Sequence, residues 1–183
     1  HGFPVVRFLI EECRANVNAR KDEGVNALMC VCAAGGSTSM LTIRYLVEKC
    51  GSKLSSTDDN GCLPLHHLIM GGGTKDALEY LLDCAPETLN TQADVNGNEG
   101  YTPIMTAIDF QAEHLIDPLL ARGADLSIKD GQGNTPIHTL CSMNADECIP
   151  LLEKLIARGV DMNEENDVGY DSEDEDYLWI NRQ

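Results

Sequence analysis

Two cysteines and two histidines are the residues whose types and spacing could do chemistry. Cys30 and Cys32 are separated by one residue, and His66 is followed directly by His67. A structural zinc ion needs four such ligands in a tetrahedral arrangement, usually as two close pairs. Neighbouring side chains on a helix point in different directions, so we expect Cys32 to face the core, Cys30 to face outward and the histidines to separate. The sequence therefore argues against a zinc site, and no metal or cofactor is expected.

A reactive thiol is the other catalytic possibility. A cysteine and a histidine can form a nucleophilic pair wherever they meet in space, which a sequence does not exclude. The run Gly71–Lys75 contains the glycines and lysine of a phosphate-binding loop, but it lacks the outer glycine spacing and the preceding strand. We expect a flexible loop there, because glycine permits a tight reversal between two helices. The favoured hypothesis is a chain that is not an enzyme.

The elements that would position these side chains recur along the chain. Five polar residues, each preceded by a small apolar residue, recur every 35 to 37 residues: Asn18, Ser55, Asn90, Ser127 and Asn163. A glycine follows six positions later, except after Asn90, where about four extra residues come first. A period of this size indicates a solenoid, in which no unit buries its apolar face alone and stacking supplies the core.

Residues 97–129 form the clearest unit. Gly100 opens a turn, Thr102 can cap a helix with its hydroxyl, and Pro103 suits the first helical position because it needs no hydrogen-bond donor there. Apolar residues then recur at helical spacing over two segments, namely Ile104, Ala107 and Ile108, followed by Leu115, Ile116, Leu119 and Leu120. Gly123 is placed to end the second helix. The pattern predicts a pair of helices that leads into an extended hairpin.

This unit resembles an ankyrin repeat. It contains Gly-x-Thr-Pro-Ile, then a helix pair, and then Ala-Arg-Gly-Ala-Asp-Leu at 121–126. The resemblance covers residues 1–169 and implies an all-α ankyrin-repeat solenoid of stacked helix pairs with short β-hairpin loops. Its units are residues 21–57, 58–96, 97–129 and 130–163, after a partial unit at 1–20 that holds a second helix and a hairpin. Leu63 replaces the capping threonine, Asn26 can still cap its helix, and Cys50 replaces the glycine that ends a helix. That last departure leaves the local turn geometry open.

The end of the chain breaks this pattern. Gly169 is on schedule for a fifth unit, but no Thr-Pro follows it. Residues 164–183 form an acidic tail, in which Glu173–Asp176 precede the apolar quartet Tyr177–Ile180. We expect the quartet to form a short cap on the last helix pair, because terminal units of solenoids are often atypical. A linear motif that binds a partner is the alternative.

Composition restricts the class of partner. The net charge of −17 argues against nucleic acid and anionic membrane surfaces, and it favours a basic protein surface. No apolar run has the length of a membrane-spanning helix, and no signal peptide is visible. Cys32, Cys141 and Cys148 fall where small apolar residues pack inside helices, which favours buried free thiols and an intracellular location, cytoplasmic or nuclear. Because there is no initiator Met, we expect a fragment of a longer protein.

The resemblance implies that hairpin tips and first helices line a concave face that binds partners. The positions expected there are Asp59, Asn60, Met70, Asn98, Glu99, Tyr101, Asp109, Phe110, Gln132, Asn134 and Met143. Interface energy concentrates in a few aromatic anchors, so Tyr101 and Phe110 are the first candidates. Phe110 could instead belong to the ordinary core. The sequence thus predicts a module that binds a basic or amphipathic protein segment, with unknown oligomeric state. The alternative is a regulatory or targeting region of a larger enzyme or channel.

The resemblance assigns roles to three further positions, and local sequence context suggests a fourth. It implies that His66 and His138 bond to neighbouring backbone and tie units together. Asn163 lies in a setting similar to that of asparagines hydroxylated in some ankyrin repeats, although an Asn that stabilises the hairpin locally is the alternative. Ser172, followed by acidic residues, is similar to sites of acid-directed kinases.

Overall fold

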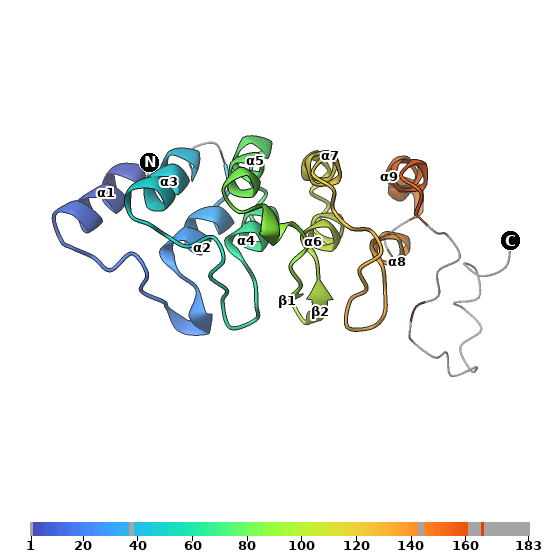
Figure 1. Ribbon diagram of the computed structural model, residues 1–183, viewed down its shortest axis with the longest axis horizontal. Coiled ribbons are helices and arrows are strands. Elements are labelled where there is room, and N and C mark those ends of the chain that lie inside the picture. Colours follow the sequence, from blue (N-terminus) through green and yellow to red (C-terminus); the bar gives the residue numbers. More distant parts are fainter. Residues whose placement is uncertain (1, 37–38, 143–144, 161–165, 167–183) are drawn as a thin grey trace, which may run out of the picture.

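Antiparallel helix pairs set side by side make up most of the structure, a computed structural model that describes residues 2–36, 39–142, 145–160 and 166. The outer row holds α1 (Phe3–Glu11), α3 (Ser39–Arg44), α5 (Lys75–Cys84), α7 (Glu113–Ala121) and α9 (Ala145–Ala157). The inner row holds α2 (Ala27–Ala33), α4 (Pro64–Met70), α6 (Pro103–Asp109) and α8 (Pro136–Cys141), and hairpins project beyond it (Figure 1). One hairpin forms a two-stranded antiparallel sheet of β1 (Ala93–Val95) and β2 (Asn98–Tyr101). The expected stack of helix pairs is confirmed.

Side chains at the helix starts explain where the inner helices begin. Asn26 accepts a hydrogen bond from the Met29 N–H at 3.0 Å, and Thr102 accepts one from the Met105 N–H at 3.5 Å. Both confirm the predicted caps, which satisfy backbone donors that have no partner within the helix. Leu63 has no capping oxygen, and its own N–H donates instead to Nδ1 of His66 at 3.2 Å. The imidazole thus satisfies the N–H of Leu63 itself, whereas the hydroxyl of Thr102 accepts from the N–H three residues on.

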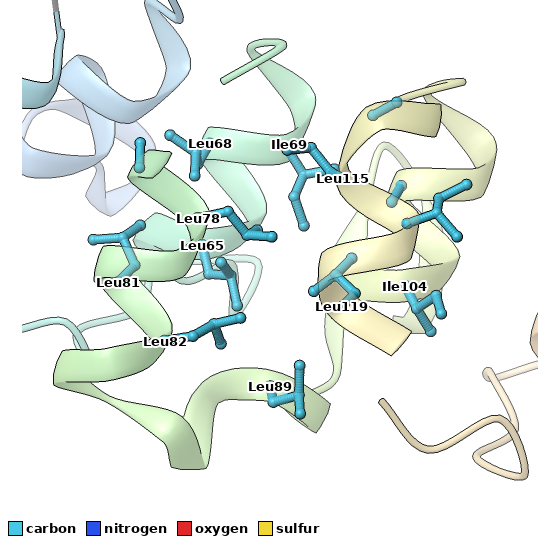
Figure 2. Packing of buried hydrophobic residues seen from close by; sticks show 14 of the residues in the cluster. Leu65, Leu68, Ile69, Leu78, Leu81, Leu82, Leu89, Ile104, Leu115 and Leu119 are labelled. Atoms are coloured by element: carbon cyan, nitrogen blue, oxygen red, sulfur yellow. The ribbon is translucent and has the colours of Figure 1, made fainter. Parts of the chain in front are cut away.

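One continuous apolar core runs between the two rows of helices. Leu65, Leu68 and Ile69 of α4 face Leu78, Leu81 and Leu82 of α5, and Ile104, Leu115 and Leu119 of the following unit continue the same cluster (Figure 2). Neighbouring inner helices are in contact throughout, as are α1 with α3, α3 with α5 and α5 with α7. Each unit therefore buries its apolar surface on its neighbours, as expected for a solenoid.

The end of the second helix in unit 21–57 differs from that of later units. After α3 the chain continues through a π-helical turn, Tyr45–Lys49. The Ser52 N–H then bonds to the Leu46 carbonyl at 2.9 Å, six residues back, whereas the Ala124 N–H reaches only five residues back. Gly51 has a positive φ of +69°, and Gly123 has a positive φ of +86° at the corresponding turn of unit 97–129. The turn accommodates one extra residue, which explains how the helix ends without a glycine at Cys50.

Polar pairs join successive outer helices in one direction. The hydroxyl groups of Tyr45 and Tyr80 donate to Glu11 and Glu48, each at 3.1 Å. Arg122 pairs with Asp83 at 2.6 Å, and Lys154 pairs with Asp117 at 2.9 Å. In all four pairs the acid belongs to the earlier unit and the donor to the later one. We name these four pairs the outer ladder; since they are exposed, each contributes little to stability.

Two expectations about local packing were wrong. Cys141 is exposed at the end of α8, although the sequence placed it inside, because the apolar face of this short helix is already formed by Ile137 and Leu140. The glycine loop after α4 is tightly packed where we expected flexibility. A Cβ atom at Gly71 would overlap the Ala33 carbonyl oxygen, and one at Gly73 would overlap Leu68. His114 also bonds to the Gly73 carbonyl at 2.8 Å, so three units meet at this loop.

Gly71→Ala should destabilise the protein by about 1–3 kcal/mol, because the added methyl group forces units 21–57 and 58–96 apart. Gly72→Ala is the matched control, since its φ of +65° costs roughly 1 kcal/mol while a Cβ there meets open space. Urea unfolding followed by circular dichroism measures both. A smaller loss for Gly71→Ala than for Gly72→Ala would contradict the close contact.

Candidate interaction surface

The hairpins and the inner helices α2, α4, α6 and α8 form one side of the stack, which we name the inner face (Figure 1). Backbone hydrogen bonds connect its hairpins in series. The Asp59 N–H donates to the Glu23 carbonyl at 3.0 Å, the Asp94 N–H to the Asn60 carbonyl at 2.8 Å, and the Gly131 N–H to the Glu99 carbonyl at 2.7 Å. Main-chain contacts therefore join the four hairpins in a continuous row.

Two aspartates, the buried Asp58 and the partly buried Asp130, hold the turns of two hairpins. Oδ1 of Asp58 accepts hydrogen bonds from the N–H groups of Asn60 at 3.0 Å and Cys62 at 2.8 Å. Asp130 does the same with Gln132 at 2.9 Å and Asn134 at 2.8 Å. Such bonds fix a turn locally and present the residues between them to solvent. The exposed residues at these two tips thus sit on rigid loops.

Three side chains that the sequence did not single out as structural links join the hairpins further. His67 contacts Oδ2 of Asp58 through Nε2 at 2.9 Å, which ties α4 to its own hairpin. Arg20 donates to the carbonyls of Gly24 and Thr57, both at 2.7 Å, and Gln92 donates to those of Gly100 and Lys129, both at 2.8 Å. The carbonyl in the next unit lies 37 residues on in each case. The repeat period could have predicted the two links that Arg20 and Gln92 make to the next unit.

The expected partner-binding residues divide by exposure. Asp59, Asn60, Glu99, Asp109 and Gln132 are exposed, while Met70, Asn98, Phe110 and Asn134 are partly buried. Met143, Asn163 and Ser172 lie outside the described residues. Burial raises the pKa of Asp109, which lies next to Phe110 at the end of α6. The exposed members are therefore mainly carboxylates and amides, with two apolar side chains set partly beneath them.

Tyr101 is not the exposed anchor that the sequence predicted. Its side chain is only 8% exposed and packs in a small cluster with Cys62, Ala93, Val95 and Met105. Met70 and Phe110 pack against the same cluster from the solvent side. Tyr101 pairs with Ala93 across the two-stranded sheet, and this pairing turns its ring toward the inner helices. Phe110 accordingly belongs in part to a local core, the alternative that the sequence left open.

The candidate zinc ligands do not converge. Cys32 is buried and Cys30 is exposed, as predicted, and His66 is buried while His67 binds Asp58. Over the described ranges, no three His, Cys, Asp or Glu side chains are grouped as a metal ion requires. Burial raises the pKa of Cys32 and of Cys62 to about 12, so neither thiol is ionised near neutral pH. Neither of these two is therefore an activated nucleophile.

His66 fulfils its expected structural role within its own unit. Its Nδ1 accepts from Leu63, as Nδ1 of His138 accepts from Thr135 at 3.1 Å. Its Nε2 is buried and has no partner at good geometry in the described part of the chain, although backbone groups of Tyr101 and Thr91 raise the pKa of the ring. Burial is the larger effect and lowers the pKa of His66 from the ordinary 6.5 to about 4. The link to the next unit is therefore weaker than expected.

Asp58→Ala should reduce the free energy of unfolding by about 2 kcal/mol, because it leaves two backbone donors and His67 without their acceptor. Asp59→Ala is the matched control. Asp59 is exposed and lies 3.4 Å from Arg20, so we expect a change within about 0.5 kcal/mol. Urea midpoints measure the difference, and equal losses would show that Asp58 does not hold the turn.

His66→Met tests the depressed pKa, since Met29 occupies the equivalent position of unit 21–57 and accepts from Asn26 through sulfur at 3.5 Å. As the pH falls from 6.5 toward 4, the unfolded state binds a proton at His66 before the folded state does. The wild-type protein should therefore lose on the order of 3 kcal/mol relative to His66→Met over that window. Unfolding free energies of both chains at several pH values measure this. Parallel pH curves would contradict a buried neutral imidazole.

Comparison with known proteins agrees with this architecture. A protein-family model described as ankyrin repeats (3 copies) matches residues 1–92 and 42–130. A stretch of 75 residues is 40% identical to part of a probable serine/threonine-protein kinase from Dictyostelium discoideum, covering 39% of this chain and 8% of that protein. The chain thus spans a small part of the length of this relative. In the portion that the structure describes, no helix has the length and apolarity needed to cross a bilayer. The chain belongs to the ankyrin repeat family.

Proposed function

We propose that this chain binds a basic or amphipathic segment of a partner protein on its inner face. Ankyrin repeats are in general modules for protein interaction and are in general not catalytic, so the proposal concerns the kind of partner and the place where it binds. The observation that carries it is a rigid row of hairpins that presents carboxylates. Glu23, Asp59 and Glu99 are exposed in three successive hairpins, and backbone hydrogen bonds join these hairpins.

The distribution of charge supports a cationic partner. No lysine or arginine occurs between Lys75 and Arg122, a stretch that includes β1, β2, α6 and the whole of α7. Asp109 lies in this stretch, exposed at the end of an inner helix. A surface of one sign accelerates the encounter with an oppositely charged segment and disfavours wrong partners. The central two units are therefore where a basic segment would meet least repulsion.

Apolar side chains on the same face support an amphipathic segment. Met70 and Phe110 lie at the ends of α4 and α6 and are partly exposed over the cluster that contains Tyr101. Fully or partly desolvated apolar contacts give more affinity than exposed ion pairs do. The carboxylates would orient the partner and the two apolar side chains would hold it.

Free thiols, buried at Cys32 and Cys62, fit an intracellular location.

A second proposal is that the chain is the regulatory or targeting region of a larger enzyme. The similarity to part of a probable serine/threonine-protein kinase, of which this chain covers 8%, favours it. In that case the inner face would recruit a substrate or a regulator, and catalysis would lie in other sequence. The complete coding sequence distinguishes the two proposals directly.

Neutralising the inner face should weaken partner binding by roughly tenfold, because three exposed carboxylates would each lose a pairing of about 0.5 kcal/mol. The variant combines Asp59→Asn, Glu99→Gln and Asp109→Asn and leaves the buried Tyr101 intact. The matched control has the same net charge and combines Asp76→Asn, Glu113→Gln and Glu153→Gln, three exposed acids on outer helices.

Quantitative capture of proteins from an extract of the source cells, with each immobilised chain compared by mass spectrometry, is the measurement. We expect the basic proteins captured by the wild-type chain to be depleted with the inner-face variant and retained with the control. Equal capture by both variants, each folded by circular dichroism, would show that the inner face is not the binding surface.

A further inference from the structure

Among the described residues, the final outer helix, α9, carries an apolar stripe that no neighbouring helix covers. Ile149, Leu152 and Ile156 of α9 are spaced by three and four residues, so they lie on one face of the helix. Ile149 is 54% exposed and Ile156 is 45% exposed. Large aliphatic side chains are ordinarily the most buried in a protein. We name these three residues the terminal stripe.

The same helical position is covered inside the stack. Ile156 lies 36 residues after Leu120 of α7, just as Gly159 lies 36 residues after Gly123, so the two side chains are equivalent. Leu120 is only 5% exposed, because the following unit packs on it and Arg158 bonds to its carbonyl at 3.0 Å. Leu152 is likewise less buried than its equivalent, Ile116, which is 1% exposed. At Leu152 and Ile156 the terminal stripe therefore has the form of a surface that receives a further element, whereas Ile149 adds an apolar side chain where unit 97–129 has the exposed Glu113.

We propose that the terminal stripe is covered by the chain's own segment Tyr177–Ile180, which closes the end of the stack. The segment Tyr-Leu-Trp-Ile is a run of four apolar residues directly after the acidic run Glu173–Asp176. Left in water it would expose four large apolar side chains, and docking removes apolar surface of the segment and of the stripe from water. The adjacent carboxylates repel one another and stay in solvent.

The connection is long enough for this docking. Asn166 bonds to Asn134 at 3.2 Å, which fixes the chain at the hairpin of unit 130–163. The eleven residue steps from Asn166 to Tyr177 span up to about 36 Å when extended. The thirteen residues of α9 extend over about 20 Å. The extended linking segment is therefore longer than α9 itself.

Tryptophan fluorescence tests the proposal, because Trp179 is the chain's single tryptophan. In the 183-residue protein, Trp179 emission should be blue-shifted and less quenched by acrylamide than in the same chain unfolded in urea. The double variant Ile149→Gln, Ile156→Gln should shift the emission and the quenching to the values of the unfolded chain. Leu41→Gln is the matched control, since Leu41 is 63% exposed on α3 at the other end of the stack and should leave both readouts unchanged.

A variant of the tail makes the test independent of α9 stability. Leu178→Ser alters only the covering segment and should give the same red shift, with the circular dichroism of the stack preserved. Wild-type emission equal to that of the unfolded chain would overturn the proposal. So would a blue shift that survives Ile149→Gln, Ile156→Gln. A blue shift that disappears on dilution, together with a dimer in sedimentation, would show that a second copy covers the stripe and would overturn the intramolecular cap.

Discussion

No helix pair in this protein has enough apolar surface to form a core alone, so every unit depends on contact with its neighbours. The clusters around Leu65, Leu78 and Leu119 are shared between units, and Gly71 shows how close the contact is, since its backbone leaves no room for a methyl group against Ala33. This dependence explains why the units are aligned so regularly. It also explains why apolar side chains are left open on α9, at the end of the described helix pairs.

Much of the fold followed from the sequence because local chemistry and period agree. Thr102, Asn26 and Gly123 have roles that depend on a few adjacent residues, and the structure places each as expected. The opposite faces of Cys30 and Cys32 follow from helical geometry alone. At Cys50 the sequence showed only that the glycine expected to end the helix is missing. The π-helical turn that accommodates it depends on how α3 packs, which the sequence does not encode locally.

The candidate site was less predictable, because a repeat gives the position of a residue but not the direction of its side chain. Tyr101 occupies a tip position by count, yet the extra residues around Asn96 and Gly97 create a true two-stranded hairpin that turns its ring inward. The exposed acids Asp59 and Glu99 were placed correctly, since a tip residue without a turn-forming bond faces solvent. Asp58 is buried and accepts from two N–H groups of the turn, whereas Asp59 faces solvent, and no local sequence pattern distinguishes these two adjacent aspartates. Whether the predicted residues bind a partner remains a prediction.

The outer ladder has a consequence for how such a chain changes over evolutionary time. Because each unit offers an acidic acceptor on one side and a hydroxyl or cationic donor on the other, its two borders are complementary to each other. Unequal recombination that duplicates or deletes a whole unit would therefore again bring a donor against an acceptor at the new junction. Gain or loss of units would create no repulsion between like charges on this side of the molecule, so the length of the array could vary while its joints stayed compatible.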